Sequence, residues 1–313
     1  MNFLSNVRKL LSANIHSLFH SKRFWLCGIF MAALAIYSIL NIFGYRSRNF
    51  DVSLESTCLQ YIPLLFCLIP AMCALFINTD YNDGTIRNKL TVGCGRGALY
   101  FANLISSYLQ ALFYSAVYMI VLLPVGSFIV RIEDPGRLFS MLGMCLLAML
   151  SLTALAVHTA MLISHRWALV LCTFLGIGLM LMGVMTNDLL EAPKMIDDYD
   201  SVVMTSRESM EDGTYIMEYL DKDGNKINPE DIPKVENPNY IEEPTRSIMR
   251  TFNEIQPGGQ IYDILGNGHT ERDENDERIT VQVPYWKLAA YSLAVTVLFT
   301  AAGIWLFKRK DLK

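Results

Sequence analysis

The chain alternates between long apolar stretches and shorter polar connections. Six of the apolar stretches contain about 20 or more residues, the length at which a helix crosses the hydrocarbon core of a bilayer. They are Phe24–Phe43, Cys58–Asn78, Phe101–Val130, Leu138–Ile163, Trp167–Thr186 and Tyr285–Phe307. The pattern predicts an all-α polytopic membrane protein with six transmembrane helices.

Two features of these stretches modify that simple picture. The third stretch is long enough to tilt in the bilayer or to extend beyond it. Pro63, Pro70 and Pro124 lie inside predicted spans. Neighbouring helices can satisfy the backbone carbonyls that such prolines leave free.

Residues 1–23 have the spacing of an amphipathic helix. Apolar residues recur at helical spacing, at Phe3, Leu4, Val7, Leu10, Leu11, Ile15, Leu18 and Phe19. Arg8, Lys9, Asn14 and Ser17 fall elsewhere on the helical wheel. No small-residue cleavage pattern follows the first apolar run, so we expect no cleaved signal. The segment is predicted to lie on the membrane surface as a cytosolic interface helix that leads into the first span.

Charged residues are few and unevenly distributed. They make up 18% of the chain, against about a quarter in a typical soluble protein. Residues 187–284 hold 23 acidic and 9 basic residues, a net charge of −14, and the rest of the chain holds 7 acidic and 17 basic residues, a net charge of +10. Such asymmetry is typical of a chain that crosses a membrane.

The basic residues near the span ends set the predicted orientation, because positively charged loops stay in the cytosol. Placing the N-terminus in the cytosol puts 12 bases and only three acids on that side. The bases are Arg8, Lys9, Lys22, Arg23, Arg87, Lys89, Arg96, Arg166, Lys308, Arg309, Lys310 and Lys313, and the acids are Asp80, Asp83 and Asp311. We therefore expect a multi-pass protein of the cell membrane with both termini in the cytosol.

The acidic segment 187–284 then lies outside, between the fifth and sixth spans. Its length suits a small domain of mixed structure. "TYIMEY" has the alternation of a strand, and Ile248, Met249, Phe252 and Ile255 have helical spacing before a Pro-Gly-Gly break. We expect this helix to touch the membrane or the next span, and "ERDENDERI" to be a solvated charge run. None of the seven cysteines falls in the segment, which excludes disulfides there.

Common catalytic and nucleotide-binding motifs are missing from the sequence. There is no Gly-x4-Gly-Lys-Ser/Thr loop, no His-Glu-x-x-His and no Gly-x-Ser-x-Gly, and "GCGRG" lacks dinucleotide-binding spacing. The predicted spans contain no carboxylate of the kind that proton-driven transporters use. His158 and His165 share a helical face, which indicates packing more than metal binding. We predict no catalytic, metal or cofactor site in this chain, so that energy must come from another subunit.

Small residues cluster in the fourth and fifth spans. They are Gly176, Gly178 and Gly183 in the fifth, and Ser151, Ala154, Ala156 and Ala160 in the fourth. Such residues let helix backbones approach closely. Packing within one subunit is the main interpretation, and a dimer seam or translocation path is the alternative.

The connection between the second and third spans, residues 79–100, is longer and more polar than a simple link requires. Asp83 can cap a short helix whose first turn is Gly84, Thr85 and Ile86. From that helix Arg87, Asn88 and Lys89 would project, and "TVGCGRG" would end it. The result is a short helix across the cytosolic face that presents charges to a partner protein.

This arrangement resembles the permease subunits of type 2 ABC transporters. The likeness lies in "NDGTIRNKL", followed several residues later by Arg96 and the next span, and in the interface helix, the six spans, the large outer loop before span six and the ending "FKRKDLK". The acid common in the motif is here Asp83, preceded by Asn82. A purely topological role of the loop, as a positively charged anchor, is the alternative.

The resemblance implies that the loop is a coupling helix against a separate ABC ATPase subunit, which binds ATP and Mg. By position it implies the coupling residues Asp83, Gly84, Thr85, Arg87, Lys89 and Arg96. It also implies a second permease copy, as a homodimer or heterodimer, contact with membrane lipid and not nucleic acid, and export of a peptide, antimicrobial or lipid-like substrate.

The predicted organisation has four parts. They are the interface helix (1–23), spans one to five with the coupling loop (24–186), the acidic extracytoplasmic domain (187–284), and span six with a basic tail (285–313). Two other functions stay open: a membrane sensor or immunity protein that binds a ligand with its outer domain, and a membrane-embedded enzyme. The spans do not offer the convergent polar residues that an embedded enzyme needs.

Overall fold

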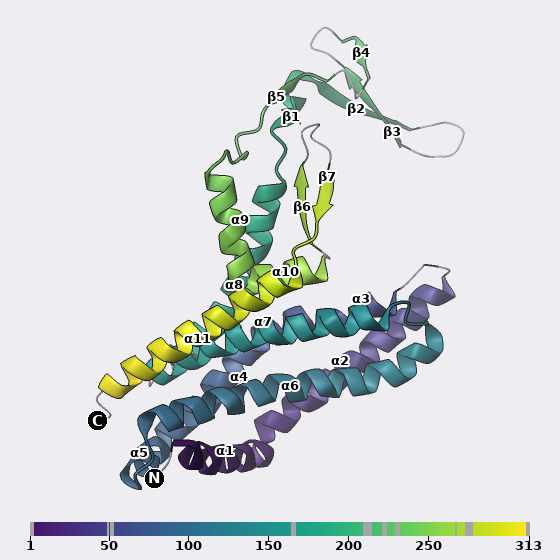
Figure 1. Cartoon of the computed structure of the whole chain (residues 1–313). Helices are drawn as coiled ribbons and strands as arrows, with labels where there is room; N and C mark the ends of the chain where they lie inside the picture. Colours follow the sequence, from purple (N-terminus) through teal and green to yellow (C-terminus); the bar gives the residue numbers. More distant parts are fainter. Residues whose placement is uncertain are drawn as a thin grey trace.

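The computed structural model shows a bundle of long helices with a smaller, strand-containing part at one end (Figure 1). It describes residues 3–48, 50, 53–163, 167–208, 215–220, 224–228, 232–266, 268–272 and 278–310. Within these ranges, six helices are long and apolar enough to span a membrane. They include α2 (Lys22–Ser47), α4 (Ile62–Asn82), α6 (Arg96–Ile129), α7 (Pro135–Leu162), α8 (Trp167–Glu191) and α11 (Tyr285–Arg309). The six-span prediction is confirmed.

The second span differs from its prediction at the start. A turn at Gln60 and Tyr61 separates the short helix α3 (Leu54–Leu59) from α4. Pro63 therefore stands in the first turn of α4, where the N–H that proline lacks would have no partner in any case. Pro70 and Pro124 lie inside α4 and α6 as predicted. The 34-residue α6 is about 50 Å long, which exceeds a bilayer core of about 30 Å.

Helices α4, α6 and α7 form the centre of the bundle. α2 packs against α6, α8 packs against α4, and α11 packs against α7 and α6. Burial is greatest in α4 and α7, whereas α2, α8 and α11 leave large apolar side chains such as Leu26, Phe174 and Val297 exposed. An exposed apolar surface of this kind is what a lipid-facing helix requires.

The interface helix α1 (Phe3–His20) packs against α6. Its buried stripe repeats every four residues and combines Leu10 and Leu18 with Asn6 and Asn14. Phe3, Leu4 and Phe19 are exposed. The amphipathic helix is confirmed, but the face that meets the bundle is partly polar because Asn14 has polar partners there.

The part between α8 and α11, which is predicted to be extracytoplasmic and is called the outer part below, contains short antiparallel strands. β1 (Met195–Asp197) pairs with β5 (Lys234–Glu236), and β3 (Tyr215–Leu220) lies between β2 (Val203–Glu208) and β4 (Lys226–Ile227). β6 (His269–Arg272) pairs with β7 (Arg278–Val281). A short 3-10 turn, Tyr199–Ser201, precedes β2. The strand expected at "TYIMEY" is β3, whereas the ends of "ERDENDERI" are paired strand residues and its centre, 273–277, lies outside the described residues.

The helical break in the outer segment is confirmed by α9 (Thr245–Ile255) and α10 (Pro257–Leu265), which meet at Gln256. α9 contacts α8 and α11, but with its polar face. Arg246 and Glu254 are buried there, while Ile248 and Phe252 are 66% and 49% exposed. The predicted contact of this helix with the next span, α11, is confirmed. Its polar residues make the contacts: Arg246 donates to the Leu190 carbonyl of α8, and Glu254 pairs with Lys287 of α11 at 2.5 Å.

Candidate functional site

The predicted coupling element is the seven-residue helix α5 (Thr85–Thr91). α4 continues to Asn82, and Asp83 ends it, with its N–H donating to the Thr79 carbonyl at 3.0 Å. Gly84 follows in the left-handed region, with φ 66°, and stands before the first residue of α5. Asp83 is therefore the C-terminal cap of α4 and not the N-cap of α5, whose cap makes no side-chain hydrogen bond.

Glycine makes the sharp turns at both ends of α5 possible. Gly84 and Gly93 have φ values of 66° and 91°, which side chains with a Cβ rarely adopt. Between them, Ile86 is 1% exposed and packs with Val7, Leu10 and Phe307 in a cluster at this end of the bundle. α5 is thus held by a buried anchor and turned at each end by glycine.

The polar side chains of the element divide into two groups. The side chains of Asp83, Arg87 and Asn88 are exposed, and that of Thr85 is half-buried, as is the residue Gly84. Lys89 does not project outward as predicted. It lies three residues after the buried Ile86, on the same helical face, and therefore points into the protein.

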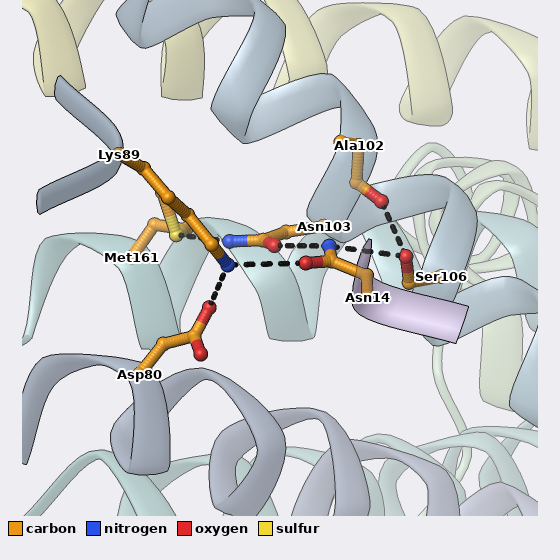
Figure 2. Close-up of polar contacts among 7 residues, drawn as sticks. All are labelled: Asn14, Asp80, Lys89, Ala102, Asn103, Ser106 and Met161. Carbon is orange, nitrogen blue, oxygen red and sulfur yellow. Dashed lines mark hydrogen bonds and ion pairs between the residues drawn. The ribbon is translucent and has the colours of Figure 1, made fainter. Parts of the chain in front are cut away.

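Lys89 joins α5 to two other helices (Figure 2). Its Nζ lies 2.6 Å from Asp80 Oδ2 of α4 and donates to Asn14 Oδ1 of α1 at 3.1 Å. The side chains of Lys89 and Asp80 are only 15% and 13% exposed. A charge pair so shielded from water, with a further hydrogen bond, depends on both partners. We call this set, Lys89 with Asp80 and Asn14, the Lys89 clamp.

The clamp continues into the centre of the bundle through Asn14. Its amide donates to Asn103 Oδ1 at 2.9 Å and to Ser106 Oγ at 3.2 Å, and Ser106 donates to the Ala102 carbonyl (Figure 2). Asn103 also contacts Met161 Sδ of α7 at 3.3 Å. These polar groups are buried and satisfied, so α1, α4, α5, α6 and α7 meet in one network.

Arg96 has a second internal role. Its Nη1 donates to the carbonyl oxygens of Phe307, Lys308 and Lys310, at 3.2, 2.9 and 2.6 Å. These carbonyls are at the C-terminal end of α11, where a cation also complements the helix dipole. Arg96 therefore fastens the loop to the last span.

Lys310 links the same end of α11 to α7 and α4. Its Nζ donates to the Met161 carbonyl at 3.0 Å and lies 4.6 Å from the centre of the Tyr81 ring. Burial lowers the pKa of Lys310.

Among the 12 bases predicted to be cytosolic, Arg166 and Lys313 lie outside the described residues, as does the acid Asp311.

Sequence reasoning found Lys89 and Arg96 but missed what they bind. From the sequence, Asp80 is only one of the three acids predicted to be cytosolic, and Asn14 is only one of the polar residues on the wheel of the amphipathic helix. Asn103 and Ser106 are spaced i, i+3 in the third span, and polar residues at that spacing in an apolar stretch share one face. That spacing was the available signal.

The family model described as ABC-2 family transporter protein matches residues 13–312. This range includes the Lys89 clamp, Arg96 and all six long helices. The chain belongs to the ABC-2 transporter family. The resemblance drawn from the loop is thereby confirmed, and the ABC-2 permease is a membrane-spanning transport component that associates with an ABC ATPase. A comparison with curated proteins gives no match.

The small residues of the ABC-2 permease largely serve packing within the chain. A Cβ on Gly176 would lie 3.0 Å from Pro70, and one on Gly183 would lie 2.7 Å from the Gly258 backbone, whereas one on Gly178 would meet nothing within 4 Å. Ser151, Ala154, Ala156 and Ala160 are fully buried. His158 packs on Phe299 of α11, with Nδ1 3.3 Å from its carbonyl oxygen, and His165 lies outside the described residues.

Proposed function

We propose that this permease is the membrane-spanning subunit of an ATP-driven exporter in the cell membrane, with both termini in the cytosol. Two permease copies, identical or different, would associate with two cytosolic ATPase subunits that bind ATP and Mg. The substrate class is a peptide, an antimicrobial or a lipid-like compound. The observation that carries the proposal is the division of the loop into an exposed side, with Asp83 before α5 and Arg87 on it, and an internal side with the Lys89 clamp.

That division suits an element that transmits a conformational change from a bound ATPase to the membrane helices. An ATPase that docks on Arg87 would move α5 about the glycines at its ends. Lys89 would transmit the movement to α4 through Asp80 and to α1 through Asn14, and Arg96 would transmit it to α11. Because these helices pack as discrete units, their movement changes access across the membrane as a switch between arrangements.

Co-purification tests the proposal. The detergent-solubilised wild-type chain, expressed in its own cells, is expected to recover an ATPase with a Walker motif. Arg87→Glu is expected to lower that recovery at least tenfold, because an acidic partner surface that attracts Arg87 would repel the glutamate, and about 1.4 kcal/mol is already a factor of ten. The control is Arg46→Glu, the same charge change at an exposed position in the last turn of α2, outside the loop that contains α5. This variant is expected to recover the ATPase fully.

Two results would count against the proposal. One is recovery of no ATPase with the wild-type chain and no ATP-dependent transport in reconstituted vesicles. The other favours the sensor or immunity alternative: function that survives Arg87→Glu but is lost when the outer segment between α8 and α11 is removed.

A further inference from the structure

A cavity of about 420 Å³ lies beside the junction of α1 and α2. We call it the elbow pocket. Its polar lining comes from the junction, from the end of α4 and from the middle of α6. The residues that matter are Ser21, Lys22, Arg23, Thr79, Asp80 and Gln110. None of them lies on the exposed side of α5, although Asp80 also belongs to the Lys89 clamp, so the pocket is a site distinct from the predicted ATPase contact.

Gln110 is the feature that points to a ligand. Gln110 is one of the residues around the pocket, and it is only 1% exposed. Neither the amide nitrogen nor the amide oxygen has a hydrogen-bond partner within the part of the chain that the structure describes. Buried polar groups are almost always hydrogen-bonded, so a partner from outside the chain is expected in the pocket.

The charge of the pocket indicates an anion. Lys22 and Arg23 line it, and neither forms an ion pair with a described residue. The carboxylate of Asp80 is already neutralised by Lys89 at 2.6 Å. α2 begins at Lys22, and Ser21 makes no side-chain cap, so the first backbone N–H groups of this helix are open donors. A phosphate group suits such a helix N-terminus with two cations beside it.

The rest of the wall is apolar, with Phe24 of α2 and Met72, Leu75 and Phe76 of α4. The pocket therefore combines cations and donors with an apolar surface, at the point where the first span begins. Trp25, whose indole donates to the Phe19 carbonyl at 2.7 Å, is the kind of side chain that sits at the headgroup level. An anionic lipid has the matching arrangement of phosphate and acyl chain.

We propose that the elbow pocket binds the phosphate of an anionic phospholipid from the leaflet on the side of the N-terminus. Lys22, Arg23 and the first turn of α2 hold the phosphate, Gln110 hydrogen-bonds the headgroup, and Phe24 and Phe76 contact the chain. Asp80 belongs to both the pocket and the Lys89 clamp, so the lipid lies next to the predicted coupling element.

Thermal unfolding of the full purified chain in detergent tests this proposal. We expect added phosphatidylglycerol to raise the melting temperature by about 5 °C or more at roughly 100 times its Kd, and phosphatidylcholine to have much less effect. The double variant Lys22→Gln/Arg23→Gln is expected to lose this rise. Arg8→Gln/Lys9→Gln removes the same charge from exposed positions of α1 outside the pocket and is expected to retain it.

Gln110→Leu separates binding from folding. Because it removes an unpartnered buried amide, we expect the variant without lipid to melt at or above the wild-type temperature, yet to lose most of the rise with phosphatidylglycerol. An unchanged rise in Gln110→Leu, or an equal loss in the Arg8/Lys9 control, would overturn the proposal. A full rise with inorganic phosphate alone would overturn the assignment to a lipid.

Discussion

Asp263 is a carboxyl group buried at the outer end of the bundle. It is 3% exposed, its Oδ1 has no partner among the described residues, and it lines a cavity of about 440 Å³ that Arg137 also lines. Burial and the nearby Glu254 carboxylate raise the pKa of Asp263 to about 7, and Lys287 partly offsets them. The folded protein therefore holds a proton near neutral pH that the unfolded chain releases.

The pH dependence follows from that raised pKa. The stability that the protonated Asp263 provides is fully present below pH 3.8, its ordinary pKa, and is lost as the pH rises through about 7. At about 1.4 kcal/mol per pH unit, the loss is at most about 4 kcal/mol. We expect the melting temperature to fall between pH 5 and about pH 8 and Asp263→Asn to flatten that slope. A slope that Asp263→Asn leaves unchanged would contradict this assignment.

Two glycines of α8, Gly183 and Gly178, allow a comparison of one substitution at a crowded and at an open position. Gly183→Val would push a side chain into the Gly258 backbone, which cannot move aside as a flexible side chain can. We expect a loss of about 1–3 kcal/mol and a lower melting temperature. Gly178→Val, on the same helix with nothing within 4 Å, is the control. Equal melting temperatures of the two variants would show that α8 and α10 do not pack so closely.

At the scale of elements, periodicity predicted the helices better than it predicted their orientation. α1 and α9 are both amphipathic as expected, yet each buries polar residues, Asn14 in one and Arg246 in the other. The partners that make such burial favourable, Asn103 and the Leu190 carbonyl, are distant in sequence. The inward orientation of the Lys89 side chain could not be predicted for the same reason, because its partners Asp80 and Asn14 come together only in the folded bundle.

The burial of the polar face of α9 predicts an unusual mutational pattern. Arg246→Met should lower stability by about 1–3 kcal/mol, because the Leu190 carbonyl loses its donor in a buried site. Phe252→Ser, at an apolar but 49% exposed position, should change it by less than about 0.5 kcal/mol. The opposite ranking in thermal unfolding would mean that the apolar face of α9 is the one that packs.

At the scale of the whole molecule, the six spans were predictable because each is a long apolar run, and length alone identifies it. The first and last described residues lie at the end of the bundle that contains α5 (Figure 1), as an even number of spans requires. The strands of the outer part were mostly not predictable. β1 and β5 have three residues each and pair across about 40 residues of chain, too short a pattern to detect. The network at α5 required the fold itself, since it joins residues from five helices.

The most direct test of the account is ATP hydrolysis by the permease reconstituted with its ATPase. Lys89→Met breaks the clamp but leaves the exposed face of α5, so we expect normal co-purification of the ATPase. We expect the effect of the permease on the hydrolysis rate to fall on the order of tenfold, which corresponds to about 1.4 kcal/mol of lost coupling. Unchanged hydrolysis in Lys89→Met, with the ATPase still bound, would contradict the claim that α5 transmits force through Lys89.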